Sequence, residues 1–322
     1  MDHVGIDVHK KESQVCILEE DGSIIEKRIR TLRERFAEVF GGRPKARILV
    51  ESSTESEWVA RCLESLGHEV VVADPNFSPM YATRSRKVKT DKRDARTLAE
   101  ACRLGAYKAA HRTSDERRHL RGQFAAREVL VRTRTRLISL MRALLRREGI
   151  HVGTGSAAAF QKRMGAVQLP EYMEKEVAPL LAMMEPLNTQ IAVLDAQLQR
   201  VAETDEHVRL LCTAPQIGPV TASAFASAVD KPERFANGHQ VSAYFGLVPC
   251  EMSSGEKQRK GRITKAGNTR VRWLLVQAAI SIMRVKAKET QHLREWATRI
   301  AARRGKKTAV VALARKLAGT SG

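Results

Sequence analysis

The stretch Val4-Gly5-Ile6-Asp7-Val8-His9-Lys10 decides the fold of the first part of this chain. Its β-branched residues predict a short buried strand, and Asp7 lies where that strand ends. A hairpin is predicted directly after it, because two β-rich runs, 13–18 and 23–26, are separated by Asp21-Gly22. We therefore expect a sheet that begins with three sequential strands.

Two more strands and a helix complete the expected sheet. Residues 46–51 have the pattern of a buried strand that ends at Glu51, and residues 68–73 have the same pattern and close at Asp74-Pro75. Between them, a helix ended by Gly67 is predicted by apolar residues at helical spacing: Trp58, Leu63 and Leu66. This order predicts an α/β domain with a mixed sheet.

Four carboxylates lie at element ends in this part of the chain: Asp7, Glu51, Asp91 and Asp94. In an RNase H-type sheet the strand ends that carry Asp7 and Glu51 lie side by side, and Asp91 and Asp94 share one helix face. Acids gathered in a chain of net charge +20 favour an Mg²⁺ site, with Mn²⁺ as an alternative. The competing interpretation is solvated surface acids, with Asp91 acting only as a helix N-cap. Asp74 ranks below the four because Asp-Pro more often closes a strand as a turn.

The composition favours a polyanionic partner. The chain has 322 residues, enough for two domains, and 56 Lys and Arg against 36 Asp and Glu. We therefore favour a protein that binds nucleic acid. The alternatives are a merely soluble basic protein and a protein bound to an anionic membrane surface. The five cysteines are far apart, which speaks against zinc and against a disulfide framework. No apolar run approaches the roughly 18 residues of a membrane span, so we expect a cytoplasmic, nucleoid-associated protein without a membrane partner.

The middle of the chain is predicted to be helical. Residues 114–148 carry apolar pairs every seven residues, and the stretch 111–148 holds eleven arginines and four acids. Residues 177–201 show a second seam with the spacing of a coiled coil, which Pro179 and Pro186 should start or kink. The two helices and the connector 149–170 predict an antiparallel hairpin or a dimer seam, and the pattern does not choose between them.

The last third is predicted to be mainly helical. Residues 213–222 form a tight turn that enters a helix, and such turns either bind a phosphate through backbone N–H groups or are purely structural. From Arg262 onward the chain is helical and basic, with a core stripe at Leu274, Leu275, Ala278 and Ile282.

A serine-containing segment lies between these helical parts. Ser253 and Ser254 precede Gly255, and seven basic residues follow between 256 and 272, among them Lys257, Arg259, Lys260, Arg262, Lys265 and Arg270. A hydroxyl ringed by cations can bind a phosphate or attack it. Composition alone favours a phosphate-binding loop without covalent chemistry.

These stretches together resemble the DEDD-type insertion-sequence transposases of the insertion sequence 110 / 1111 family. The resemblance rests on Val4 to Lys10, on Val50-Glu51-Ser52, on residues 89–95, and on 245–249 through Ser254-Gly255 to 263–268. It covers both ends of the chain in the expected order, which is more specific than any one motif.

The resemblance implies a RuvC-like N-terminal domain and a separate serine-bearing transposase domain. It implies that Asp7, Glu51, Asp91 and Asp94 bind Mg²⁺ and that Ser254 is the nucleophile that takes a DNA strand into a phosphoserine link, with Ser253 as the alternative. It also implies a structured bridge RNA, encoded by the element, that pairs with donor and target DNA. Backbone contacts by the arginine-rich helix, at Arg127, Arg134 and Arg142, would fit that partner. The final helix, near Thr308, is expected to be shorter than in other members.

The sequence therefore predicts three parts: an RNase H/RuvC-like metal-binding domain (1–112), a helical coiled-coil region (113–205) and a mainly α serine transposase domain (206–322). The predicted function is that of a serine-dependent, metal-assisted DNA recombinase that works as a homo-oligomer, a dimer or a tetramer. The alternatives are a two-metal, structure-selective nuclease that uses water and a non-catalytic nucleic-acid-binding protein.

Overall fold

The computed structural model describes residues 1–81, 90–251 and 260–320. The chain separates into two compact units, Met1–Arg112 and Thr113–Gly322, and each is described by itself. The division into three functional parts stays a prediction.

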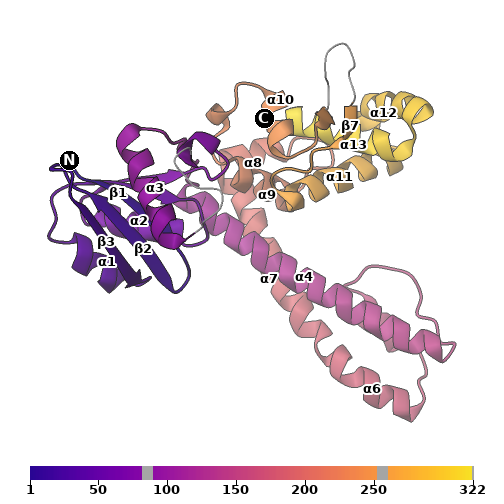
Figure 1. Cartoon of the computed structure of the whole chain (residues 1–322). Coiled ribbons are helices and arrows are strands. Elements are labelled where there is room, and N and C mark those ends of the chain that lie inside the picture. Colours follow the sequence, from indigo (N-terminus) through magenta and orange to yellow (C-terminus); the bar gives the residue numbers. More distant parts are fainter. Residues whose placement is uncertain (82–89, 252–259, 321–322) are drawn as a thin grey trace. The chain divides into compact units, whose positions relative to one another are not determined.

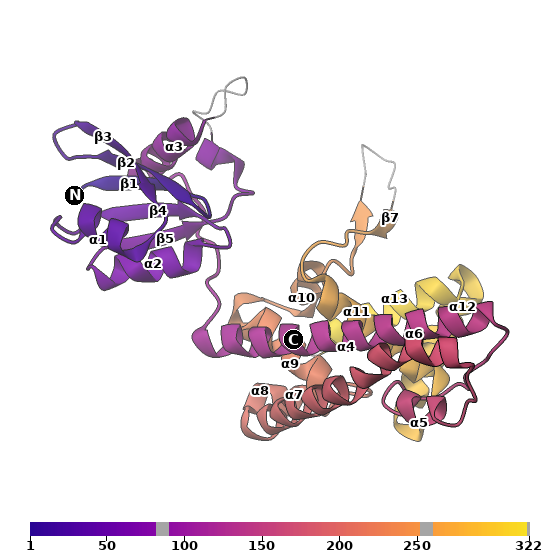
Figure 2. The same cartoon turned by 90° about the horizontal axis from the view of Figure 1, so that it is seen from below.

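The first unit, indigo to purple in Figure 1, is built on a five-stranded mixed sheet in the order β3-β2-β1-β4-β5, which can be followed in Figure 2. Neighbours β1, β2 and β3 are antiparallel, whereas β4 runs parallel to both β1 and β5. The predicted hairpin and strands are confirmed, and so is the mixed α/β sheet. The strands are β1 (His3–Val8), β2 (Glu12–Leu18), β3 (Ile24–Arg30), β4 (Arg47–Glu51) and β5 (Glu69–Ala73).

Different helices cover the two faces of this sheet (Figure 2). Helices α1 (Arg33–Phe40) and α2 (Ser56–Ser65) pack on one face, where their apolar residues join those of β1 in a buried cluster. A short 3-10 helix, η1 (Ser78–Tyr81), and helix α3 (Asp91–Leu104) lie on the opposite face. The α2 prediction is confirmed, including its end before Gly67.

Gly5 allows α3 to lie directly on the sheet. Val4, Ile6 and Val8 point into the cluster beneath α1 and α2, so Gly5 and Asp7 face α3, because side chains alternate along a strand. A Cβ built on Gly5 would fall 2.2 Å from the carbonyl oxygen of Ala95 in α3. The absence of a side chain at residue 5 is therefore what lets the first turn of α3 approach the end of β1.

The second unit begins with a long helix that packs against a later, antiparallel helix. Helix α4 (Asp115–Arg147) packs against α7 (Met184–Thr204). The pair is antiparallel, because Arg134 bonds Asn188 whereas the earlier Arg127 pairs with the later Asp195. The structure thus contains the predicted helical hairpin, and a dimer seam stays a prediction.

The second predicted helix is two helices that meet at Met183, in agreement with the prediction that a proline starts or kinks it. Helix α6 (Glu171–Ala182) contains Pro179 within it, and Pro186 lies in the first turn of α7, where a missing N–H leaves no helical bond unmade. The connector contains a short helix, α5 (Phe160–Met164), whose Phe160 is buried with Met141 and Leu145 of α4.

The rest of the second unit surrounds one large apolar core. It confirms the buried stripe at Leu274, Leu275, Ala278 and Ile282, but the prediction of a helix from Arg262 is wrong, because residues 260–263 form a strand and the helix begins at Thr269. Its helices are α8 (Glu206–Leu211), α9 (Pro219–Val229), α10 (Gly238–Tyr244), α11 (Thr269–Arg284), α12 (Gln291–Arg304) and α13 (Lys306–Thr320), with short 3-10 helices η2 (Pro232–Arg234) and η3 (Lys288–Thr290). A small two-stranded sheet joins β6 (Pro249–Glu251) to β7 (Lys260–Ile263).

One stretch of the described residues is long and apolar enough to cross a membrane, by length and composition only. It runs from Glu171 to Thr204 and comprises α6 and α7. Val177 of α6 and Met184 of α7 are buried in the same apolar cluster of this unit. All five cysteines are free thiols.

Candidate metal centre and nucleic-acid interface

Two of the predicted acids lie at the ends of adjacent parallel strands, on the same side of the sheet. Gly5 of β1 pairs with Leu49 of β4, and Asp7 and Glu51 each follow two positions later. Because two residues along a strand return to the same face, both carboxylates lie on the side that α3 covers. The prediction that these two strand ends lie side by side is confirmed.

The first turn of α3 carries the other two acids. Thr90 is the N-cap residue, and its hydroxyl accepts a hydrogen bond from the Arg93 N–H. The interpretation of Asp91 as the cap is therefore wrong, and Asp91 is the first residue of the helix. Asp91 is exposed, and Asp94 is half-buried one turn further on. Carboxylates in a first turn also interact favourably with the positive end of the helix dipole.

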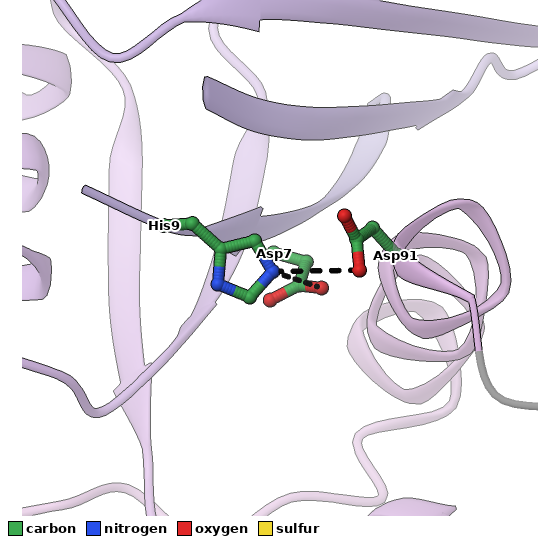
Figure 3. Close-up of side chains that lie close together, drawn as sticks. All are labelled: Asp7, His9 and Asp91. Atoms are coloured by element: carbon green, nitrogen blue, oxygen red, sulfur yellow. Dashed lines mark ion pairs between the residues drawn. The ribbon is translucent and has the colours of Figure 1, made fainter. Parts of the chain in front are cut away.

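A histidine that the sequence analysis did not select lies between two of these acids. Figure 3 shows the His9 ring aimed at the carboxylates of Asp7 and Asp91. His9 Nε2 lies 3.4 Å from Asp7 Oδ2 and 3.5 Å from Asp91 Oδ1. One ligand atom from each of the three residues lies within 4.8 Å of the other two. Among the described residues, these three are the group of His, Cys, Asp and Glu side chains close enough to share one metal ion.

Glu51 is held by a tyrosine from the same face. The hydroxyl of Tyr81, at the end of η1, donates to Glu51 Oε2 at 2.6 Å. A charge-assisted bond of this length orients one carboxylate oxygen and leaves the other for a second partner. Tyr81 was also not selected from the sequence, because it stands 30 residues from Glu51 in the chain.

The electrostatics of Asp7 reflect the crowding of acids around it. Burial raises the pKa of the Asp7 carboxyl, His9 lowers it, and Asp94, Asp91 and Glu51 raise it further. The pKa of Asp7 is thus coupled to each of the other three predicted acids. Gathering carboxylates in this way costs free energy unless a cation neutralises them.

The donor set suits a hard divalent cation. Carboxylate oxygens are the ligands that Mg²⁺ and Mn²⁺ prefer, and the imidazole of His9 adds a nitrogen donor that Mn²⁺ accepts more readily than Mg²⁺. Ligand atoms on one octahedral ion are about 3 to 4 Å apart, given metal–oxygen distances near 2.1 Å. The spacings from His9 to Asp7 and Asp91 fall in that range.

Asp74 lies apart from this constellation. Its Oδ1 accepts from the backbone N–H and side-chain amide of Asn76, at 2.9 and 3.0 Å. These bonds lower the pKa of Asp74 and close β5 with an Asx turn. The lower rank given to Asp74 agrees with this local role.

The serine segment falls outside the described residues, and so do the predictions for Ser253, Ser254, Lys257 and Arg259. Strands β6 and β7 flank the segment on its two sides. Of the predicted basic residues that follow, Arg262 and Lys265 are exposed, whereas only the backbone of Lys260 is described.

A buried arginine joins the two loops at the base of these strands. Arg272 donates to the carbonyl oxygens of Phe245 and Ala266 at 2.9 and 2.8 Å, and to Thr269 Oγ1 at 3.2 Å. Burial lowers the pKa of its guanidinium. Gly246 and Gly267, with φ of 65° and 67°, form the tight turns of the two loops. One side chain of α11 thus ties together the loop that precedes β6 and the loop that follows β7.

A basic groove borders the same strands. Its volume is about 660 Å³, and the described residues that line it include no acid. Four of them are cationic: Arg262, Lys265, Lys307 and Arg315. A groove of this charge suits a phosphate backbone.

The arginines selected on α4 make contacts within the unit. Arg127 pairs with Asp195, Arg134 donates to Asn188 at 2.8 Å, and Arg142 donates to the Gly153 carbonyl at 3.1 Å. Burial lowers the pKa of Arg134. Their role in nucleic-acid binding stays a prediction, and their described contacts stabilise the helical hairpin. Arg270 pairs with Glu128 across α4 and α11 at 3.2 Å.

The turn at residues 213–222 leads into α9, as expected, with Pro219 in the first helical position. Gln216 has a positive φ of 62°, and its side-chain oxygen accepts from Ser281 Oγ. This contact fits the structural interpretation of the turn.

Comparison with known proteins identifies the class. Residues 4–149 match a family model for DEDD-type transposases, and residues 208–294 match the model described as "Transposase IS116/IS110/IS902 family". The protein is therefore a transposase, an enzyme that acts on DNA.

Several relatives extend the similarity over nearly the whole chain. A probable family 20 transposase of Pseudomonas aeruginosa is 29% identical over 98% of this chain and 94% of its own length. A putative transposase of Sinorhizobium fredii is 31% identical over 89% of this chain and 74% of its own length. The transposase for insertion sequence element IS1111A of Coxiella burnetii is 27% identical over 97% of this chain and 86% of its own length. This chain belongs to the IS110 family of DEDD-type transposases.

Proposed function

We propose that this transposase is a serine-dependent, metal-assisted DNA recombinase that moves an insertion sequence. The observation that carries the proposal is the meeting of Asp7 and Glu51 at adjacent strand ends beneath the first turn of α3. The strand order, with three antiparallel strands followed by two parallel ones, supports an RNase H/RuvC-like first domain.

The acids and His9 would hold the cation. We assign Mg²⁺ or Mn²⁺ to Asp7, Glu51, Asp91 and Asp94, because burial and the charges of the other three carboxylates raise the pKa of the half-buried Asp7. When bound, such an ion supplies positive charge to the phosphate on which the reaction develops negative charge. Tyr81 fixes the orientation of Glu51, and Gly5 keeps α3 close enough for its two aspartates to take part.

The nucleophile in this proposal is Ser254, with Ser253 as the alternative. Its hydroxyl oxygen forms a bond to phosphorus, the bond from phosphorus to one deoxyribose oxygen breaks, and the serine proton passes to that leaving oxygen. The phosphoserine link is a phosphodiester like the bond that it replaces, so no free energy of hydrolysis is lost. A second deoxyribose hydroxyl can therefore attack the phosphorus, release the serine and join the DNA strand to a new partner. The basic groove at Arg262, Lys265, Lys307 and Arg315 supports this role, because cations there can hold the flanking phosphates.

We propose that an element-encoded bridge RNA selects the DNA sequence. The protein then contacts the backbone of the nucleic acid and recognises its shape. The excess of 56 Lys and Arg over 36 Asp and Glu supports binding of two polyanions. We also propose a dimer or a tetramer, in which the coiled-coil pattern of the middle region joins protomers. The metal-binding acids (1–112) and the serine domain (206–322) then come from one chain or from two.

A recombination assay on plasmids tests the proposal. Asp7→Ala and Ser254→Ala should each abolish recombined joints while circular dichroism stays native. If two protomers supply the two halves, mixing the two variants restores recombination. Hydrolysed DNA ends without joints, made equally by Ser254→Ala and by the native chain, would instead indicate a nuclease that uses water. DNA binding with no dependence on Asp7 or Glu51 and no strand cleavage would indicate a non-catalytic binding protein.

A further inference from the structure

One tryptophan of this chain is exposed, and it lies in a groove between α4 and α11. The Trp273 side chain is 47% exposed, whereas Trp58 packs edge-on against Phe36 and Trp296 packs against the core of the second unit. The groove has a volume of about 740 Å³. A large exposed aromatic surface costs free energy in water, so its position calls for a partner.

Arginines surround Trp273. The guanidinium carbon of Arg270 lies 4.2 Å from the centroid of the indole ring, which places the cation over one ring face. Glu128 fixes Arg270 at 3.2 Å and also pairs with Arg132. Arg132 is 66% exposed, and Arg136 is exposed one helical turn further along α4.

The charge and polarity of the groove indicate which chemical class of partner it binds. Three arginines and one glutamate line it, which favours an anionic partner. Apolar walls at Ala125, Val129 and Val131 separate the cations. Arg132 and Arg136 are about 6 Å apart along the helix axis, a spacing that allows contacts to successive phosphates of an extended strand.

We propose that this groove binds single-stranded DNA, with an unpaired base stacked on Trp273 and the flanking phosphates at Arg132 and Arg136. The base must be unpaired, because a duplex keeps its base faces inside its own stack. The apolar walls suit deoxyribose better than ribose, whose extra hydroxyl would lose hydrogen bonds to water there. The groove shares no residue with the acids of the first unit, and of the described basic residues named after Ser254 only Arg270 lines it.

Trp273 fluorescence tests this site directly. In the full chain carrying Trp58→Phe and Trp296→Phe, Trp273 is the sole indole, and a short oligo(dT) should quench its emission at saturation. In the native background, Trp273→Ala should weaken oligo(dT) binding roughly tenfold or more. Arg132→Gln together with Arg136→Gln should reduce the slope of log affinity against log salt by about 1.4, or about 0.7 for each single-strand phosphate contact. Arg200→Gln, at an exposed position of α7, is the matched control and should change the slope less.

Four results would overturn the proposal. They are an unchanged Trp273 emission at saturating oligo(dT), equal quenching by a blunt duplex, tighter binding of oligo(rU) through the same residues, and self-association without DNA that Trp273→Ala abolishes. The last result would make the groove an interface between two copies. If the double Phe variant does not fold, the difference in quenching between the native chain and Trp273→Phe gives the same readout.

Discussion

Gly5 of β1 lies so close to Ala99 of α3 that a Cβ on the glycine would fall 2.2 Å from the Ala99 nitrogen. Helix α3 carries Asp91 and Asp94, so this contact sets the distance from these acids to Asp7 at the end of β1.

Gly5→Ala should therefore disturb both the fold and the metal site. Forcing α3 away from the sheet should lower the free energy of unfolding by about 1–3 kcal/mol, the usual cost of overpacking. Mn²⁺ binding, measured by calorimetry, should weaken with it. Gly42→Ala is the matched control, because a Cβ there would have no heavy atom within 4 Å. Equal effects of the two substitutions would contradict the positioning role of Gly5.

The pH dependence of stability should report the crowded carboxylates. Burial raises the pKa of Asp7 above its ordinary value of 3.8, so the folded state holds this proton more tightly than the unfolded chain. The stabilisation is complete below that ordinary value and is lost as pH rises through the raised pKa of the folded state. Asp7→Asn should remove this loss and raise the stability of the metal-free protein near neutral pH, while it weakens Mg²⁺ binding.

Urea unfolding in EDTA, from about pH 4 to 7, checks the sign of this effect. Addition of Mg²⁺ should restore stability to the native chain at the upper end of the range and should do little for Asp7→Asn. If the free energy of unfolding has the same pH dependence in both proteins, the ionised Asp7 does not destabilise the metal-free fold.

His9 should be a direct ligand of the bound ion. Its Nε2 is 3.4 and 3.5 Å from oxygens of Asp7 and Asp91, longer than good hydrogen bonds and suited to ligands of one ion. Electron spin echo spectra of bound Mn²⁺ should show coupling to an imidazole nitrogen, and His9→Gln should abolish it and weaken Mn²⁺ binding roughly tenfold, or 1.4 kcal/mol. His111→Gln serves as the control. Nitrogen coupling that survives in His9→Gln would rule out this ligand.

Arg272 should hold the base of the β6 and β7 strands. Arg272→Met leaves the carbonyl oxygens of Phe245 and Ala266 without this donor, and we expect a loss of about 3 kcal/mol in the free energy of unfolding. Arg272→Lys should recover part of it, because one ammonium cannot reach all three acceptors. Chemical denaturation compares these variants with Arg262→Met, at an exposed position nearby. A cost no larger than that of Arg262→Met would show that Arg272 does not anchor the loops.

The parts of the fold that could be predicted from sequence depend on local patterns. The Asp21-Gly22 turn, the strand that ends at Glu51 and the stripe from Leu274 to Ile282 each follow from residues near one another in the chain. The helix break at Met183 was predicted only as a start or kink at Pro179 or Pro186, because the apolar spacing continues across it and the prolines alone indicate an interruption.

The parts of the site that were missed depend on contacts between distant residues. Tyr81 reaches Glu51 across 30 positions, and Arg272 reaches Phe245 across 27, so no local pattern marks either. His9 was visible in the opening stretch, two residues after Asp7, but only the approach of α3 brings it between two acids. Thr90 competes with Asp91 for the cap position, and the helix begins one residue earlier than an Asp91 cap would place it.

The central claim is that the acids and the serine serve one strand-transfer reaction, and the most direct measurement is mass spectrometry of the protein–DNA adduct. The native chain, incubated with Mg²⁺, its element ends and the element-encoded RNA, should yield a peptide in which Ser254 carries a nucleotide phosphate. The adduct should disappear in Ser254→Ala and in Asp7→Ala. Adducts that persist when both Ser253 and Ser254 are replaced by alanine would contradict the account.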